Sequence, residues 1–154
     1  MIQLALFQPE IPQNTGTMLR LAACWGIDVN IIGPCGFIWS ERRLKRAGMD
    51  YINHVCIQHH SSWMQFKEHK QSNRLILLTP QTEQSYLDFC FAPNDYLMVG
   101  QESSGVPENV FEATDAQVKI PMRKACRSLN VALSAAIVLG EAMRQLDLIP
   151  GEKS

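Results

Sequence analysis

Short apolar runs recur along the chain, and turn residues bound each of them. They cover residues 2–7, 29–32, 55–57, 75–78 and 96–99, with a weaker sixth run at 117–120. Runs of this kind are typical of buried strands in a mostly parallel sheet. The pattern therefore predicts six strands.

Stretches with helical periodicity lie between these runs. They predict helices over residues 14–25, 40–47, 62–70, 107–113 and 128–146. Asn14 or Thr15 is suited to cap the first helix, Ser61 or Ser62 is suited to cap the third, and Gly48 ends the second. The alternation of strands and helices favours a single α/β domain over residues 1–154, with helices on both faces of the sheet.

The last predicted helix is apolar on nearly all sides. One stripe consists of Leu129, Ala132, Leu133, Ala136, Ile137, Gly140 and Met143, and the apolar residues Val131, Ala135, Val138 and Leu139 lie outside it. A helix with this pattern is buried on more than one side. In a domain of this size, another subunit is the expected cover for the second side. The alternative is a helix deep in the core of a single chain.

Composition narrows the class of protein. The 154 residues include 14 basic and 15 acidic side chains, which excludes a globally basic nucleic-acid binder but not a local basic patch. Five widely spread cysteines without a Cys-x-x-Cys pair argue for reduced, buried thiols rather than a disulfide framework or a zinc site. Because no apolar run approaches the ~18 residues of a membrane span and no signal peptide is evident, we expect a soluble cytoplasmic protein. We expect no metal, because the adjacent His59 and His60 have no carboxylates or cysteines at ligand spacing.

Polar residues gather in three segments, 9–20, 99–107 and 120–130, each next to the end of a predicted strand. Asn14 lies where the first helix begins, Glu102 follows the fifth strand, and Ser128 and Asn130 precede the last helix. In an open parallel sheet, ligands bind beyond the carboxyl ends of the strands. Each residue also has a plain structural interpretation, since Asn14 and Ser128 are suited to helix caps and Glu102 to a solvated turn.

Two local clusters of basic residues stand out against the neutral composition. They are Arg42, Arg43, Lys45 and Arg46 in the second predicted helix, and Arg123, Lys124 and Arg127 in the third polar segment. Neutralisation of phosphates by such side chains is the main source of nucleic-acid affinity. A solvated charged helix face or loop is the alternative.

Taken together, the three polar segments resemble the motifs of a known enzyme class. Asn-Thr-Gly-x-x-x-Arg at 14–20, Gly-x-Glu-x-x-Gly at 100–105, and Ile-Pro-Met followed by Ser-Leu-Asn-Val-Ala within 120–132 are similar to the three motifs of the SPOUT-class RNA 2′-O-ribose methyltransferases. The chain resembles their small single-domain subgroup, which acts on the wobble cytidine or uridine of tRNA. The resemblance implies a C-terminal deep trefoil knot and an obligate homodimer, with the ligand site near the subunit interface.

The same resemblance implies S-adenosylmethionine as the cofactor. The matching cofactor positions are Leu78, Thr79, Gly100, Glu102, Ile120, Met122 and Ser128. The apolar members would form a slot for adenine, and Gly100 would let the backbone come close to the ribose or the methionine part. No metal is required, because the positive sulfur already activates the methyl group.

The resemblance assigns activation of the ribose 2′-hydroxyl to Arg20. An arginine acts as a base only if it is strongly perturbed; otherwise it holds the phosphate and polarises the hydroxyl. Asn14 and Asn130 would position the reacting groups. The residues expected to hold the anticodon stem-loop are Arg42, Arg43, Arg46, Arg123, Lys124 and Arg127.

One position departs from the pattern of the best-known members of the subgroup. Ser104 stands where those members have an arginine, so Arg123, Lys124 or Arg127 would have to replace its contact. Three alternatives remain open. They are a ribose methyltransferase of another tRNA or ribosomal RNA position, an RNA-binding module without catalysis, and a flavodoxin-like nucleotide binder.

Overall fold

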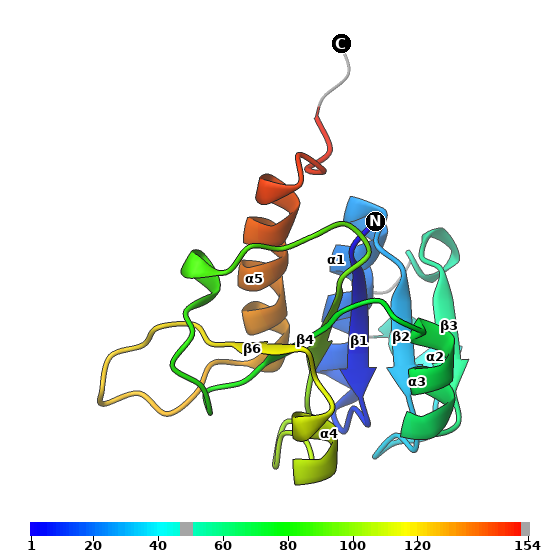
Figure 1. The fold of residues 1–154 in the computed structure, drawn as a ribbon. Coiled ribbons are helices and arrows are strands. Elements are labelled where there is room, and N and C mark those ends of the chain that lie inside the picture. Colours follow the sequence, from blue (N-terminus) through cyan, green and yellow to red (C-terminus); the bar gives the residue numbers. More distant parts are fainter. Residues whose placement is uncertain (47–50, 152–154) are drawn as a thin grey trace.

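The computed structural model describes residues 1–46 and 51–151, which form one parallel sheet covered by helices. The strands are β1 (Gln3–Phe7), β2 (Val29–Ile32), β3 (Ile57–His60), β4 (Leu75–Leu78), β5 (Tyr96–Val99) and β6 (Ala116–Val118). Their order in the sheet is β3-β2-β1-β5-β4-β6, and every neighbouring pair is parallel (Figure 1). The predicted parallel sheet is confirmed, and the carboxyl ends of all its strands meet at one edge.

Helices pack on both faces of this sheet. They are α1 (Pro12–Trp25), α2 (Glu41–Arg46), α3 (Trp63–Lys70), α4 (Glu108–Glu112) and α5 (Val131–Gln145), with two short 3-10 helices, η1 (Ile52–His54) and η2 (Tyr86–Asp88). The larger core joins one face to α1 and α5, through Leu19 and Leu139 among others. Phe66 of α3 and Val110 of α4 belong to a second core on the other face. The predicted α/β architecture is confirmed.

The third strand begins two residues later than predicted. Residues 52–54 form η1, in which Ile52 is buried, and β3 follows at 57–60. Because β3 is an edge strand that pairs only with β2, it leaves Gln58 and His59 exposed. Its sequence therefore lacks the continuous apolar run that marks a strand buried on both faces.

The expected helix caps have different outcomes. Ser62 caps α3 as predicted, because its Oγ accepts a backbone N–H bond of 3.2 Å from the first turn. For α1, the predicted cap at Asn14 or Thr15 is wrong, since the helix already begins at Pro12. Proline suits a first turn, where its missing N–H has no helical partner. The stop predicted at Gly48 lies outside the described residues.

Helix α5 has one buried and one exposed apolar side. Its buried side chains are Ala132, Ala135, Val138, Leu139, Ala142 and Met143. Leu129, just before the helix, is 41% exposed, and Leu133 and Ile137 are 58% and 40% exposed. The predicted stripe is thus divided between the two sides. A helix wholly inside the core of a single chain is the wrong alternative for this protein.

All five cysteines are free thiols, but they are not buried. Cys24, Cys56, Cys90 and Cys126 are exposed and Cys35 is half-buried, so the expected burial is wrong. Cys24, for example, lies on the side of α1 that faces away from the core residues Met18 and Ala22. In the part of the chain that the structure describes, no helix is both long and apolar enough to span a bilayer.

A candidate cofactor pocket and active site

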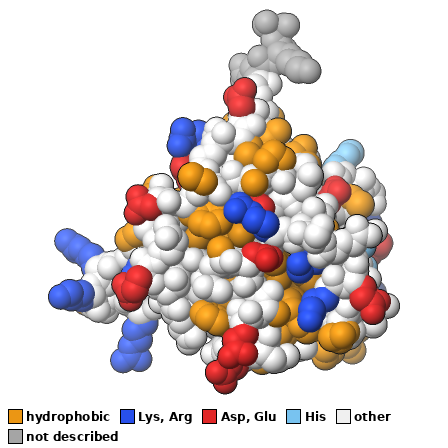
Figure 2. Space-filling model, in the orientation of Figure 1, with side chains coloured by type: hydrophobic (Ala, Val, Ile, Leu, Met, Phe, Trp, Pro, Cys, Tyr) orange, Lys and Arg blue, Asp and Glu red, His pale blue; other side chains and the backbone are white. Residues whose placement is uncertain are grey.

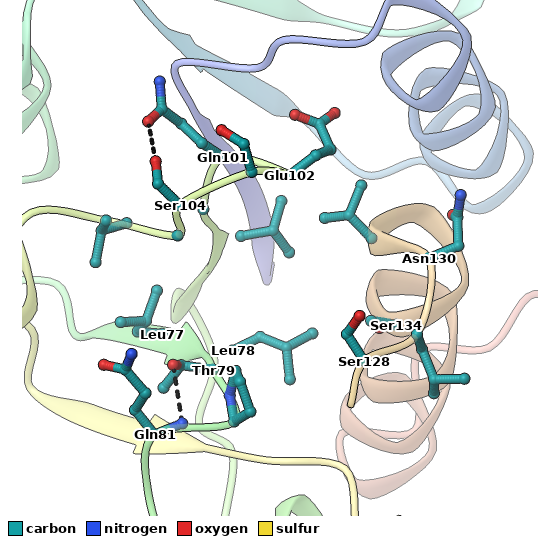
Figure 3. A pocket seen from close by; sticks show the side chains of 18 of the residues that line it. Leu77, Leu78, Thr79, Gln81, Gln101, Glu102, Ser104, Ser128, Asn130 and Ser134 are labelled. Carbon is teal, nitrogen blue, oxygen red and sulfur yellow. Dashed lines mark hydrogen bonds between the residues drawn. The ribbon is translucent and has the colours of Figure 1, made fainter. Parts of the chain in front are cut away.

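A cavity of about 670 Å³ opens at the carboxyl edge of the sheet. The three polar segments of the sequence meet around it, together with the end of β4 (Figure 3). The predicted residues that line it are Asn14, Leu78, Thr79, Gly100, Glu102, Ile120, Met122, Ser128 and Asn130. Segments far apart in the sequence therefore build one site, as the strand-end argument predicts.

The sequence analysis missed other residues of the cavity wall. They include Leu77, Pro80, Gln81, Gln101, Val106, Phe111 and Ser134. Gln81 and Gln101 lie within three residues of the ends of β4 and β5, which is the signal that would have pointed to them. Nothing in the sequence distinguishes Ser134 from other small residues of α5, because only the packing of that helix turns it towards the cavity (Figure 3).

The loop after β5 is folded back on itself. Gln101 and Gly105 exchange both backbone hydrogen bonds, at 2.8 and 2.9 Å. A Cβ on Gly100 would lie 2.6 Å from the carbonyl carbon of Gly105, so no larger side chain fits there. Gly105 itself has φ +65°, a conformation that favours glycine. The loop thus requires a glycine at position 100 for its own packing, and Gly100 also lines the cavity, where the close approach to a cofactor stays a prediction.

Glu102 joins this loop to the segment between β1 and α1. Its two carboxylate oxygens accept the backbone N–H groups of Glu10 (3.0 Å) and Ile11 (3.4 Å). In return, the Glu10 carboxylate accepts bonds from the backbone N–H (3.0 Å) and the hydroxyl (2.7 Å) of Ser103. The bonds from Ser103 lower the pKa of the Glu10 carboxyl. Glu102 therefore lines the cavity while its carboxylate holds two of the cavity walls together.

The two asparagines of the motifs are hydrogen-bonded to each other. Asn130 Nδ2 donates to Asn14 Oδ1 at 2.9 Å, across 116 positions of sequence. The Oδ1 of Asn130 accepts the backbone N–H groups of Ala132 and Leu133, so Asn130 is the N-cap of α5. The interpretation of Ser128 as the cap is wrong, since Ser128 lies before the helix and on the cavity (Figure 3).

The cavity combines an apolar wall with a few polar groups. Leu78, Ile120 and Met122 lie on it, whereas the side chains of Ser128 and Thr79 provide hydroxyl groups. Sites for cofactors have volumes of roughly 300–1,000 Å³ and this mixture of surfaces. The arrangement therefore suits a planar apolar group attached to a polar tail. No group of three or more His, Cys, Asp or Glu side chains placed to hold a metal occurs within residues 1–46 and 51–151.

The model of the SpoU rRNA Methylase family matches residues 1–140 of the chain. The protein belongs to this family. A relative from Beijerinckia indica, named "tRNA (cytidine(34)-2'-O)-methyltransferase", is 52% identical over 145 residues, which are 93% of this chain and 91% of the relative.

Solved structures extend the family likeness to three dimensions. One, described as "Structural insights into the 2-OH methylation of C/U34 on tRNA", is 41% identical with a TM-score of 0.90 and covers 96% of this chain and 97% of that one. The SpoU methyltransferase AviRb from Streptomyces viridochromogenes, described as a complex with the cofactor AdoMet, shares the fold at 22% identity. Its TM-score is 0.82, with 97% of this chain and 59% of that one covered.

In this SpoU-family chain, the predicted basic residues lie outside the cavity. Arg20 is exposed on α1, and its guanidinium carbon is 5.0 Å from the centre of the Tyr51 ring. The exposed basic residues of the two clusters are Arg42, Arg43, Lys45 and Arg46 on α2, and Arg123, Lys124 and Arg127 on the loop between β6 and α5. Figure 2 shows basic side chains projecting from that loop on the left of the view.

Proposed function

We propose that this protein transfers the methyl group of S-adenosylmethionine to the ribose 2′-oxygen of a wobble cytidine or uridine in tRNA. The observation that carries the proposal is the cavity in which Asn14, Glu102 and Asn130 meet. Two relatives support the proposal: the Beijerinckia protein is named for methylation of cytidine 34, and the structure with a TM-score of 0.90 is described for methylation of C/U34 on tRNA. Because the relatives of the chain include bacterial tRNA methyltransferases, we infer that it works in the cytoplasm.

S-adenosylmethionine fits the cavity by its chemistry. Leu78, Ile120 and Met122 form the apolar wall suited to adenine, and Thr79, Gly100, Glu102 and Ser128 line the remainder. When bound, this cofactor supplies a methyl group that its positive sulfur makes electrophilic without a metal. The residues of the chain then have to bind it, align the ribose hydroxyl, and direct the proton that leaves the hydroxyl.

Arg20, Asn14 and Asn130 carry out the alignment. A protonated Arg20 offers five N–H donors to the phosphate and the 2′-oxygen of the nucleotide. Asn130 fixes the orientation of the Asn14 amide through the 2.9 Å bond to its Oδ1. The NH2 group of Asn14 then remains for the reacting groups.

A homodimer provides the cover for α5. Leu133 and Ile137 lie one helical turn apart on its exposed side, and the exposed Leu129 precedes them while also lining the cavity. An interface on this side of α5 therefore adjoins the cavity. Burial of such side chains removes apolar surface from water, which is the main driving force of association between subunits.

The anticodon stem-loop lies against the two basic clusters. Exposed basic residues on α2 and on the β6–α5 loop provide positive charge for a polyanion. Ser104, in place of an arginine, donates its hydroxyl to Gln101 at 2.8 Å and offers no charge. Arg123, Lys124 and Arg127 take over the contact with phosphate.

The test is methyl transfer from labelled S-adenosylmethionine to tRNA isolated from a strain that lacks wobble ribose methylation. Digestion and mass spectrometry locate the label, which we expect on the 2′-oxygen of nucleotide 34. Label on another tRNA ribose, or on ribosomal RNA only, would refute the wobble assignment. Cofactor binding without any label would refute the activity.

Arg20→Ala tests the division of labour within this site. We expect it to abolish turnover while the dissociation constant for S-adenosylmethionine stays within about twofold of the original protein, because Arg20 does not line the cavity. Equal loss of cofactor binding and turnover would contradict the assignment.

A further inference from the structure

Arg20 and Arg74 both lie over an aromatic ring, but their surroundings differ. The Arg74 guanidinium lies 5.3 Å from the Phe89 ring centre and donates to Asp95 at 2.8 and 2.6 Å. The Arg20 guanidinium lies 5.0 Å from the Tyr51 ring centre. Among the described residues, no acidic side chain forms an ion pair with Arg20, and no hydrogen bond from its guanidinium is found.

An aromatic ring holds an arginine in a different way from a carboxylate. The ring attracts the cation through its face, whereas the N–H donors lie in the plane of the guanidinium and remain available. A carboxylate takes up two of these donors and neutralises the charge. The contact with Tyr51 thus orients Arg20, and among the described residues it takes up neither the N–H donors nor the charge of the guanidinium.

The position of Tyr51 is itself fixed by the fold. It is the residue before η1, where the following Ile52 is buried in the core that α1 also joins. Tyr51 is 38% exposed, so part of its surface remains accessible although the next residue is buried. The buried Ile52 therefore helps to fix the position of Tyr51, whose ring the Arg20 side chain of α1 contacts.

We propose that Tyr51 is the positioning residue of Arg20: its ring holds the guanidinium in the orientation that meets the phosphate and the ribose hydroxyl. The proposal rests on the proposed function, in which Arg20 acts on the RNA. Tyr51 does not line the cavity, and its effect on the reaction passes through Arg20.

The kinetic test compares Tyr51→Phe with Tyr51→Leu in the full chain, with an anticodon stem-loop as substrate. Phenylalanine keeps the ring, so Tyr51→Phe should retain the original kcat. Tyr51→Leu should lower kcat by about 2- to 30-fold, the range that cation–π contacts contribute, with the KM for S-adenosylmethionine unchanged. Unchanged kcat in Tyr51→Leu, or equal loss in both variants, would overturn the proposal.

A double-mutant cycle on RNA affinity separates positioning from a direct contact between Tyr51 and a base. Tyr51→Leu should weaken binding of the stem-loop in the original protein and have no further effect in Arg20→Ala, since Arg20 carries the effect. The same loss in both backgrounds would show that Tyr51 contacts the RNA by itself and would overturn the proposal. Unchanged melting temperatures exclude a general loss of structure, and Tyr51→Gln repeats the test if Tyr51→Leu does not fold.

A measurement without substrate distinguishes failure of this inference from failure of the proposed function. In the free protein, the Tyr51 ring should shift the NMR resonances of the Arg20 side chain. The shift should persist in Tyr51→Phe and vanish in Tyr51→Leu. Persistence in Tyr51→Leu would overturn the inference even in an active enzyme, whereas absence of methyl transfer by the original protein would refute the proposed function alone.

Discussion

Asn130 makes two sets of contacts that two substitutions can separate. Its Oδ1 caps α5 by accepting the N–H groups of Ala132 and Leu133, and its Nδ2 donates to Asn14. Asn130→Ala removes both sets. Asn130→Asp keeps the accepting oxygen for the cap but removes the amide donor. The pair therefore separates the contribution to stability from the contribution to the reaction.

The expected magnitudes follow from these contacts. Loss of an Asn cap costs about 1 kcal/mol, and loss of an exposed side-chain hydrogen bond costs about 0.5–1.5 kcal/mol. For a chain of this size, each kcal/mol lowers the melting temperature by roughly 2–4 °C, so Asn130→Ala should melt roughly 3–10 °C lower. Asn130→Asp should melt within about 2 °C of the original protein, because a carboxylate still caps the helix and its favourable interaction with the N-terminus of α5, about 0.3–1 kcal/mol, offsets most of the lost bond to Asn14.

The assay combines thermal unfolding at pH 7 with methyl transfer to the anticodon stem-loop. Both variants should lose about 10- to 100-fold in kcat, since the Asn14 amide is no longer held in one orientation. Ser62→Ala is the matched control. It removes the cap of α3, away from the cavity, and should lower the melting temperature without changing kcat.

Two results would refute this reasoning. If Asn130→Asp melts as early as Asn130→Ala, the accepting oxygen does not stabilise α5 in the way described. If Asn130→Asp retains full methyl transfer, the bond to Asn14 does not position the reacting groups.

Three further outcomes are expected. Gly100→Ala should abolish cofactor binding, measured by calorimetry, because its Cβ would lie 2.6 Å from the backbone of Gly105 and displace a loop that lines the cavity. Normal binding would show that the loop accommodates the methyl group. Ser103→Ala should lower the melting temperature near pH 7, because it removes a hydrogen bond to the Glu10 carboxylate. The folded-state pKa of Glu10 lies below its usual value of 4.5, so the stabilisation is present above that pH and is lost as the carboxylate is protonated at lower pH. The effect of the substitution should therefore shrink as the pH falls below 4.5. A gap that does not narrow in acid would contradict the assignment. Arg74→Ala should lower the free energy of unfolding in urea by about 1.5–3 kcal/mol, because Asp95, whose side chain is 2% exposed, loses its charged partner; a change below about 0.5 kcal/mol would contradict this.

The elements that the sequence predicts best are those whose burial is complete. Strands β2, β4 and β5 match the apolar runs, because a central parallel strand is covered on both faces and is therefore mostly apolar. The buried Asn30 of β2 is the exception, and its side chain is hydrogen-bonded to Gln3 and His60. The edge strand β3 was misplaced by two residues, since an edge tolerates polar residues such as Gln58. Helix ends are predictable where the cap bonds a neighbour in sequence, as Ser62 does with Gln65. Helix α1 has no side-chain cap and begins at Pro12, ahead of the expected Asn14 or Thr15.

The sequence by itself also determined which segments surround the cavity, though not every residue of its wall, because each of the motifs follows a strand and parallel strands end at one edge of the sheet. Which atoms meet there was decided only by the tertiary structure. The partners of Glu102 lie more than 90 positions away, and Asn14 and Asn130 are 116 positions apart. Periodicity and motifs describe neighbours along the chain. Contacts between loops depend on the order of strands in the sheet and on the packing of α1 against α5, and neither leaves a local pattern.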